Sequence, residues 1–362
     1  MIVRLRDIAK PFLKVGTFGF GGGFGMLAMI RTECVKIKKW ITDDELAIAV
    51  ALGQMVPGPY VPHYCQYIGN LLRGLPGGAT ATIALLLPSF LIMIALSWIY
   101  LVYQALPGIN FIFKGIGAVM TAIIIWAAYD MGRILIKNWK SAMILVFSLI
   151  LFSLKFDPIL TVLISGVLMV AIDHIPSRKI FLAIPLFVFE PKKALDLFWV
   201  FFKTGAVIFG GGYAAIPFME REACLTHHWV TPKEFLAGVA LGQVTPGPVA
   251  ITATFVGFKT MGLAGAFIST LAIFLPSFII LQVFIKIYKQ VEHNRFIVSL
   301  FNGLKAAVVA LLFWTGLYFA FINWHDWPYA LFGAAALVTL ILFNLQPIIL
   351  IAAGIIFGLI LR

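Results

Sequence analysis

The same motif-bearing segment occurs twice in this chain, and the duplication constrains the fold more than any other feature. Phe20-Gly21-Gly22-Gly23 recurs 189 positions later as Phe209-Gly210-Gly211-Gly212, and Pro57-Gly58-Pro59 recurs as Pro246-Gly247-Pro248. The same offset carries Lys14, Glu33, Trp40 and Gln54 onto Lys203, Glu222, Trp229 and Gln243. Chance does not align glycine triplets, prolines and a tryptophan in one register, so the chain consists of two homologous halves.

The solvent of this fold is expected to be lipid. Of the 362 residues, 62% are hydrophobic and only 12% are charged, which is more apolar surface than a water-soluble core can bury. The runs Ala79–Val102 and Ala264–Ile285 exceed the ~20 residues needed to cross a ~30 Å hydrocarbon core. Met1–Lys10 is basic, but no short apolar run with a cleavage site follows, so we expect no cleaved signal peptide. We predict an all-α, multi-pass integral membrane protein with about 10–13 membrane segments.

The net charge of +12 does not indicate nucleic-acid binding, because the basic residues lie between apolar segments. They are typical of topology signals and lipid-headgroup contacts, so we expect these residues to contact membrane lipid and not nucleic acid. Cys34, Cys65 and Cys224 are too dispersed for a disulfide framework or a zinc site. Because the chain also has no nucleophile elbow and no P-loop, we expect no enzyme activity, no metal and no cofactor.

Equivalent connectors of the two halves differ in basic residues. The connector around Trp139 carries three, whereas its counterpart Asn323–Trp327 carries none. Gln104–Lys114 has one, whereas its counterpart Lys286–Arg295 has three. Because cytoplasmic loops attract Lys and Arg, equivalent loops should lie on opposite sides of the membrane. This pattern predicts an inverted-topology repeat, an architecture that many secondary transporters share.

Each repeat is expected to contain broken or re-entrant helices. Phe12–Ile30 is rich in glycine, and such backbone is tolerated at membrane depth only where protein or a water-filled cavity satisfies it. Each proline of Pro57-Gly58-Pro59 lacks an N–H and disfavours helix before it, so Val56 should end a half-helix. Further along the first half, we expect a turn over Gly74–Gly78, a span at Gly115–Met131, and a pair of short helices at Ser141–Leu154 and Pro158–Ile172. The predicted organisation is an N-terminal repeat at 1–178, a basic linker at 179–196 and a C-terminal repeat at 197–362.

The repeated motifs have the chemistry of an anion site. Consecutive glycines can present their N–H groups to an anion, although tight helix packing also selects glycine. A lysine at membrane depth is costly without a partner or water, and so is a glutamine amide. The predicted substrate-binding residues are Lys14, Gly21, Gly22, Gly23, Gln54, Pro57 and Gly58 in the first half, and Lys203, Gly210, Gly211, Gly212, Gln243, Thr245, Pro246, Gly247, Thr252 and Thr254 in the second.

Three further side chains are candidates for proton coupling. Glu33 and Glu222 recur at the ends of the first segments of the two halves, and His63 follows the first Pro-Gly-Pro break. The alternatives are structural: a salt bridge with Arg31 or Arg221 for the two carboxylates, and a buried packing role for the histidine.

The ordered motif set resembles the chromate ion transporter family over nearly the whole chain. The second half carries it at Phe209–Gly212, Trp229, Gln243–Pro248, Ala253–Gly257 and Phe274–Phe278, and the first half at Phe20–Gly23, Trp40, Gln54–Pro59 and Pro88-Ser89-Phe90. Two first-half motifs depart from the family pattern, with Gly23 where many members have proline and a divergent Tyr64–Gly69. The resemblance implies an inner-membrane carrier that exports chromate, with sulfate as the structural analogue, built from two oppositely oriented halves.

The leading hypothesis is secondary active transport of a tetrahedral divalent oxyanion, chromate above all, coupled to an ion gradient. The alternatives are a passive anion channel and a carrier of another oxyanion or a small organic anion. A membrane-embedded enzyme acting on a lipid phosphate is disfavoured because no catalytic pairing is present. The oligomeric state stays open, with a homodimer as one option.

Overall fold

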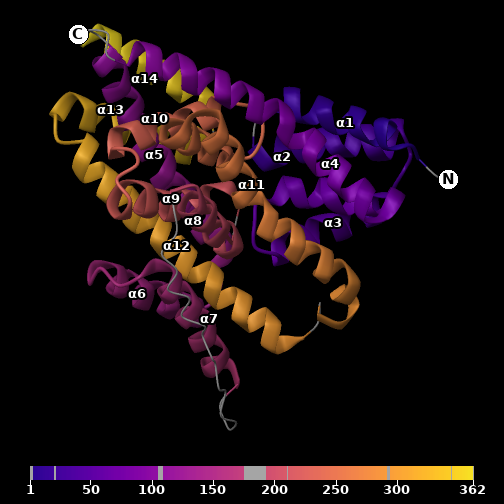
Figure 1. Cartoon of the computed structure of the whole chain (residues 1–362). Helices are drawn as coiled ribbons and strands as arrows, with labels where there is room; N and C mark the ends of the chain where they lie inside the picture. The colour runs from indigo at the N-terminus through magenta and orange to yellow at the C-terminus, as the bar shows by residue number, and fades with distance from the viewer. Residues whose placement is uncertain are drawn as a thin grey trace.

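The computed structural model describes residues 3–19, 22–104, 109–174, 193–209, 211–291, 294–343 and 345–361. All regular secondary structure in these ranges is helical, which confirms the all-α prediction (Figure 1). The first half contains α1 (Leu5–Phe18), α2 (Gly22–Ile30), the π-helix η1 (Arg31–Ile37), α3 (Asp43–Met55), α4 (Tyr60–Tyr103), α5 (Ile109–Leu135), α6 (Trp139–Ser153) and α7 (Pro158–His174).

The second half repeats this order. It contains α8 (Lys193–Val207), the 3-10 turn η2 (Gly212–Ala214), α9 (Ala215–Glu220), the π-helix η3 (Arg221–Thr226), α10 (Pro232–Val244), the 3-10 turn η4 (Val249–Ile251), α11 (Thr252–Val291), α12 (Arg295–Asn323), α13 (Trp327–Phe343) and α14 (Pro347–Ile360). Most of the predicted 179–196 linker lies outside the described residues, and α8 begins at Lys193 within its last four positions.

The described helices have the lengths and surfaces of a multi-pass membrane protein. Four of them, α4, α5, α11 and α12, contain stretches long and apolar enough to cross a membrane, and α6, α7, α13 and α14 are shorter apolar helices. Large apolar side chains such as Trp98, Phe321 and Trp327 are exposed on the outer surface, as expected for side chains that face lipid. The total number of crossings stays a prediction.

Two helices turn back on themselves at a glycine. The dihedral angles of α4 become non-helical at Arg73 and Gly74, and those of α11 at Met261 and Gly262. Gly69 and Gly77 touch across the first break, although eight residues of straight helix would separate them by about 12 Å. Each break therefore makes a helical hairpin, and the positive φ values of Gly74 and Gly262, 61° and 62°, explain why glycine stands there.

The Pro-Gly-Pro motifs break both halves as predicted. Val56 has extended dihedral angles and ends α3, and Thr245 does the same at the end of α10. The central glycines Gly58 and Gly247 have φ values of 129° and 124°, a region that L side chains rarely adopt. Each motif therefore places a helix C-terminus and the next helix N-terminus beside each other within the bundle.

The two halves are inverted relative to each other. The equivalent spans α5 and α12 lie side by side and run antiparallel: Ala118 contacts Trp324, Ile125 contacts Gly316, and Gly132 contacts Val309. Equivalent helices that cross in opposite directions are the signature of an inverted repeat. These two spans form the centre, because 67% of the apolar stretch of α5 and 56% of that of α12 are buried, against 22% for α4.

A pair of reciprocal contacts joins the halves. Gly58 packs against Ser277, and the equivalent Gly247 packs against Ser89. The hydrogen bonds at these contacts are not symmetric. Ser89 donates its hydroxyl proton across to the Pro246 carbonyl, whereas Ser277 donates to the Phe274 carbonyl of its own helix, at 3.0 Å.

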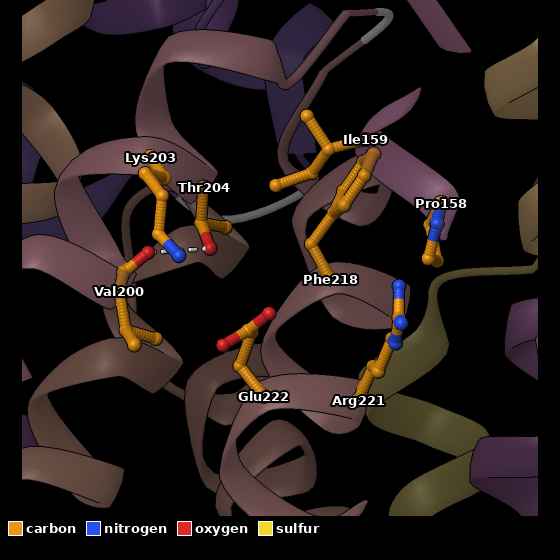
Figure 2. A pocket seen from close by; sticks show the side chains of 8 residues that line it. All are labelled: Pro158, Ile159, Val200, Lys203, Thr204, Phe218, Arg221 and Glu222. Atoms are coloured by element: carbon orange, nitrogen blue, oxygen red, sulfur yellow. Dashed lines mark hydrogen bonds between the residues drawn. The ribbon is translucent and has the colours of Figure 1, made fainter. Parts of the chain in front are cut away.

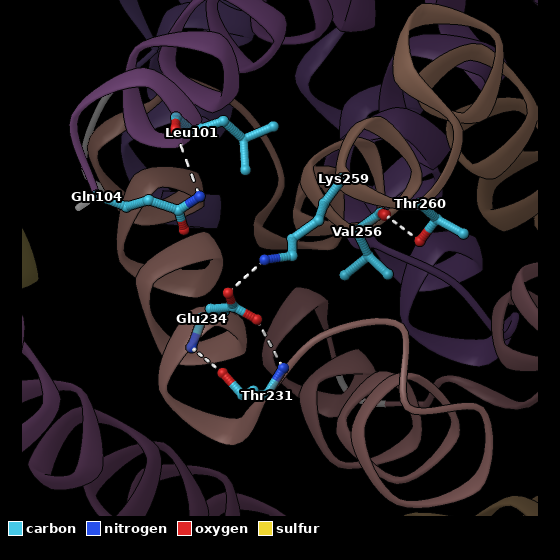
Figure 3. Close-up of polar contacts among 7 residues, drawn as sticks. All are labelled: Leu101, Gln104, Thr231, Glu234, Val256, Lys259 and Thr260. Carbon is cyan, nitrogen blue, oxygen red and sulfur yellow. Dashed lines mark hydrogen bonds and ion pairs between the residues drawn. The ribbon is translucent and has the colours of Figure 1, made fainter.

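Hydrogen-bonding side chains cap the helices that start at the connectors. The N-terminus of α10 has a capping box in which Thr231 and Glu234 bond to each other's backbone N–H, and α3 has the same box. Figure 3 shows Lys259 of α11 reaching Glu234 at this cap. Burial acts to raise the pKa of Glu234, but hydrogen bonds from Lys259 and the Thr231 backbone outweigh it and hold the pKa below its usual value.

Candidate functional site

A cavity lies where the broken segments of the two halves meet. Its volume is about 310 Å³. Both Pro-Gly-Pro breaks, the second glycine triplet, the C-terminal third of α5 and the start of α14 contribute to its wall. Its polar side chains are Gln54, Tyr60, Tyr64, Asp130, Tyr213, Gln243, Thr245 and Gln346.

Helix N-termini converge on this cavity without side-chain caps. The cavity wall includes Tyr60 at the start of α4, Val249 at the start of η4 and α11, and Pro347 at the start of α14. None of these three starts has a side-chain capping bond, whereas α3, α6, α10 and α12 are all capped by side chains. The first N–H groups of a helix lack intrahelical partners and carry partial positive charge. Uncapped N-termini around a cavity therefore favour an anion inside it.

The second glycine triplet lies at the cavity wall. Gly211 has a φ of 107° and packs against the Tyr60 ring, and Gly212 packs against the backbone of Val249. A methyl group added to Gly212 would lie 3.1 Å from the Val249 nitrogen. In the first triplet, Gly22 and Gly23 begin α2, while Gly21, like Gly210 of the second, lies outside the described residues.

Both predicted glutamines reach the cavity from the ends of half-helices. Gln54 is exposed to it near the end of α3, and Gln243 occupies the equivalent position on α10. The Tyr213 hydroxyl donates to Oε1 of Gln243 at 3.2 Å, which leaves the buried Nε2 of Gln243 without a hydrogen-bond partner. A buried amide N–H without a partner is unfavourable. An anionic oxygen in the cavity would satisfy it.

The remaining predicted residues around the breaks support the cavity rather than line it, with two exceptions. Thr245 and Gly247 are part of the wall, and the Thr245 hydroxyl donates to the Leu241 carbonyl at 2.8 Å. Thr252 and Thr254 are fully buried, and the second of these shares a 2.6 Å hydrogen bond with Thr270. Pro57, Gly58 and Pro246 lie in the breaks behind the wall.

The two motif lysines lie away from the cavity. Lys14 forms a 2.6 Å ion pair with Glu33, and this pair joins α1 to η1. Figure 2 shows the equivalent Lys203 and Glu222 directed into a separate pocket from α8 and η3. That pocket measures about 10 Å³, which is room for a single water molecule. The lysine and glutamate thus lie near each other in both halves, as an ion pair in the first and as two lining residues of the small pocket in the second.

The proton-coupling candidates are also outside the cavity wall. Glu222 lies 3.6 Å from His227, and Arg221 pairs instead with Asp157 at 2.7 Å. His63 is buried, its Nδ1 lies 3.3 Å from the Gly53 carbonyl, and its Nε2 has no partner.

Two carboxylates that matter here were not singled out from the sequence. Asp130 of α5 lines the cavity and forms a 3.1 Å ion pair with Arg133 one turn further on. Glu220 at the end of α9 is buried with Oε1 unpartnered, but it does not line the cavity. The available signal for Asp130 was an acidic residue inside the predicted span Gly115–Met131, since an ionisable group at membrane depth is a functional candidate.

Comparison with known proteins agrees with this architecture. The chromate transporter family matches the chain twice, at residues 6–170 and 195–359. The chain is 30% identical over 366 residues to a chromate transport protein of Cupriavidus metallidurans, covering 97% of this chain and 91% of the relative. It is 29% identical to a probable chromate transport protein of Synechococcus elongatus, with 92% and 89% covered. It is 32% identical to an uncharacterized transporter of Methanocaldococcus jannaschii, with 96% and 92% covered.

No solved structure matches the chain. The two family matches fall on the two halves that contain the repeated motifs, and the relatives are similar over almost their entire length. The chain therefore belongs to the chromate transporter family.

Proposed function

We propose that this protein is a secondary active carrier that exports chromate, or a closely similar tetrahedral oxyanion, across the cell membrane at the expense of an ion gradient. The observation that carries the proposal is the cavity between the halves, where three uncapped helix N-termini and the unpartnered Gln243 amide converge. The family and its members named as chromate transport proteins supply the substrate class. The family is one of transporters and not of enzymes.

The cavity suits an anion that must be released again. Each helix N-terminus carries about half a positive elementary charge, and the glutamine amides add neutral donors. The described cavity wall includes no lysine or arginine. Binding by dipoles rather than by a full ion pair supports entry of the anion without holding it so tightly that turnover stops.

The inverted repeat favours a carrier over a channel. Transporters of this construction place the substrate between their repeats, at discontinuous helices whose N-termini point at anionic groups. The breaks at Pro57-Gly58-Pro59 and Pro246-Gly247-Pro248 supply such discontinuities on both sides of the cavity. Movement of one repeat against the other would then expose the same cavity alternately to the two membrane faces.

Flux through proteoliposomes tests the proposal. We expect saturable uptake of labelled chromate that is accelerated by unlabelled chromate on the opposite side, and competition by sulfate, molybdate or phosphate ranks the substrates. Gln243→Leu serves as the cavity variant and Lys10→Gln as the surface control. A chromate current without counterflow would instead establish the channel alternative, and the absence of both would refute oxyanion transport.

A further inference from the structure

Three exposed arginines gather where the chain of the first repeat begins. Arg73 lies at the hairpin turn of α4, and its Nη1 is 3.4 Å from the Val3 carbonyl oxygen, which places this turn beside the start of α1. Arg4 and Arg6 follow Val3 directly, and all three arginines are exposed. The described chain gives them one acidic contact, from Asp7, whose Oδ1 lies 4.0 Å from Nε of Arg6. We refer to the three arginines as the arginine cluster.

The length of α4 places the arginine cluster among the lipid headgroups. The second arm of α4 runs from Gly74 to Tyr103, which at 1.5 Å per residue is about 44 Å. A bilayer is about 30 Å thick in its hydrocarbon core and about 40–45 Å thick with its headgroups. Because this arm contains a stretch apolar enough to cross the membrane, its two ends lie at the level of the headgroups.

An apolar stripe starts at the same hairpin turn. Leu75, Ile83, Leu87 and Leu91 are all exposed, and their spacing of four or eight residues places them along one side of α4. The stripe is about 24 Å long, so it runs from the headgroups into the hydrocarbon core. Cations at one end of an apolar strip match the two parts of an anionic phospholipid, whereas a free oxyanion would use the cations alone.

The hairpin itself does not require an arginine, as the second repeat shows. Met261 stands in place of Arg73 and Leu195 in place of Arg6, and the third equivalent position is a lysine. The backbone is nearly the same at both turns, with φ −154° and ψ 30° at Arg73, and φ −145° and ψ 22° at Met261. Arginine at the first turn therefore serves a contact outside the hairpin.

We propose that the arginine cluster binds the phosphate of an anionic phospholipid, and that an acyl chain of this lipid lies along the apolar stripe of α4. Guanidinium groups can donate two parallel N–H bonds to phosphate oxygens, which suits them to this headgroup. The contact ties the first repeat to one leaflet at its hairpin turn. The second repeat, with Met261 and Leu195 at the equivalent positions, has an apolar surface there.

Lipid binding by the purified full-length protein tests the proposal. Native mass spectrometry of the protein titrated with phosphatidylglycerol or phosphatidylcholine in detergent micelles gives the affinity for each lipid. We expect the wild type to prefer phosphatidylglycerol. In the triple variant Arg4→Gln, Arg6→Gln, Arg73→Gln its affinity should fall about a hundredfold, since each cation near an anionic lipid contributes roughly fivefold. The affinity for phosphatidylcholine should not change.

Two matched variants separate a local site from general surface charge. Lys36→Gln, Lys38→Gln, Lys39→Gln removes the same number of exposed cations from the connector after α2 and should keep the wild-type preference. Lysine at the three arginine positions preserves the charge and should retain most of the affinity. The melting temperature of each variant in phosphatidylcholine micelles checks that it is folded.

Three outcomes would overturn the proposal. An equal loss in the two glutamine triples would show that phosphatidylglycerol responds to net charge alone. Displacement of the lipid by inorganic phosphate at equal concentration would show that the cluster is a site for free oxyanions without an acyl contact. A wild type that does not prefer phosphatidylglycerol would refute the site outright. None of these results depends on chromate flux, so the proposed function is tested separately.

Discussion

At the scale of single residues, the motif glycines separate into two groups that the sequence alone could not distinguish. Gly205 packs against the Ile273 backbone, as the equivalent Gly16 packs against Leu85, and a side chain there would collide with a carbonyl group. Gly212 instead borders the cavity, where a methyl group would lie 3.1 Å from the Val249 nitrogen. One group is required for helix packing and the other for access to the uncapped N-terminus of η4.

Replacing Gly212 with alanine should therefore impair binding more than folding. The methyl group would screen the Val249 N–H, and loss of one charge-assisted contact corresponds to roughly a tenfold weaker oxyanion affinity. The melting temperature should stay near that of the wild type. Gly205→Ala is the matched control, because overpacking there should lower the free energy of unfolding by about 1–3 kcal/mol and leave the flux per folded molecule normal. A destabilised Gly212→Ala with normal flux would contradict this division.

The amide of Gln243 should matter more than the charge of Lys203. Gln243→Leu removes the unpartnered cavity donor, and we expect an oxyanion affinity weaker by about one to two decades. Lys203→Gln changes a side chain in the separate 10 Å³ pocket and should alter the affinity by no more than about twofold. Equilibrium binding of chromate to both variants measures the difference. A larger effect at Lys203 would show that the anion passes through that pocket.

Part of the candidate cavity wall was predictable because the repeats mark it. Gln54, Gln243, Gly211 and Gly212 were identified from their equivalent positions, and the structure brings all four to the cavity wall. Asp130 was not identified, because its equivalent in the other half is a tyrosine and its neighbours come from distant helices. Spacing along the sequence does not report which spans pack together.

At the scale of elements, backbone chemistry predicted the breaks better than their extent. Val56 ends α3 as the following proline requires, and the short pair expected at Ser141–Leu154 and Pro158–Ile172 appears as α6 and α7. The turn expected over Gly74–Gly78 is instead confined to Arg73 and Gly74, and α4 resumes immediately. The π-helical turns η1 and η3 were not predicted, since no feature of the composition marks where backbone hydrogen bonds change from an i, i+4 to an i, i+5 spacing.

The hairpin turn of α11 offers a test of backbone strain without steric collision. Gly262 has φ 62° and ψ −146°, a region that is essentially restricted to glycine, and no atom lies within 4 Å of an added Cβ. Gly262→Ala should therefore lower the free energy of unfolding by about 1–3 kcal/mol through the backbone alone. Thermal unfolding of the purified variant measures it, with Gly74→Ala as the equivalent replacement. Wild-type stability in both variants would show that the turns relax freely.

At the scale of the whole molecule, the inversion of the halves was predictable from loop charge, and the reciprocal packing was not. The pairs Gly58–Ser277 and Gly247–Ser89 are equivalent in sequence, yet only Ser89 hydrogen-bonds across to the other half. The structure is therefore a state in which the serine hydroxyl of one contact bonds across to the other half and that of the equivalent contact does not, while the Gly58 N–H donates to the Ile208 carbonyl at 2.6 Å.

Equivalent serine replacements should consequently have opposite effects. Ser89→Ala removes a bond of this state, which should shift the equilibrium roughly two- to tenfold toward the oppositely facing state. Ser277→Ala should shift it the other way, because Ser277 would bond to the Pro57 carbonyl in that other state. A cysteine introduced at Ile348 in the cavity wall reports the shift as its rate of modification from each membrane face, since the three native cysteines are buried. Shifts of both variants in the same direction would disprove that the two states exchange the Ser89 hydrogen bond for a Ser277 hydrogen bond.

The two equivalent serine–glycine contacts between the halves also set the energy scale of the proposed transport. If the two conformations exchange one serine hydrogen bond for its equivalent, their intrinsic free energies are almost degenerate, and neither is a deep trap. An imbalance comparable to a single hydrogen bond, about 1 kcal/mol, then suffices to decide which face is open. Gene duplication followed by inversion would thus provide a switch that is balanced by construction, and the small free energy of substrate binding would be enough to shift it.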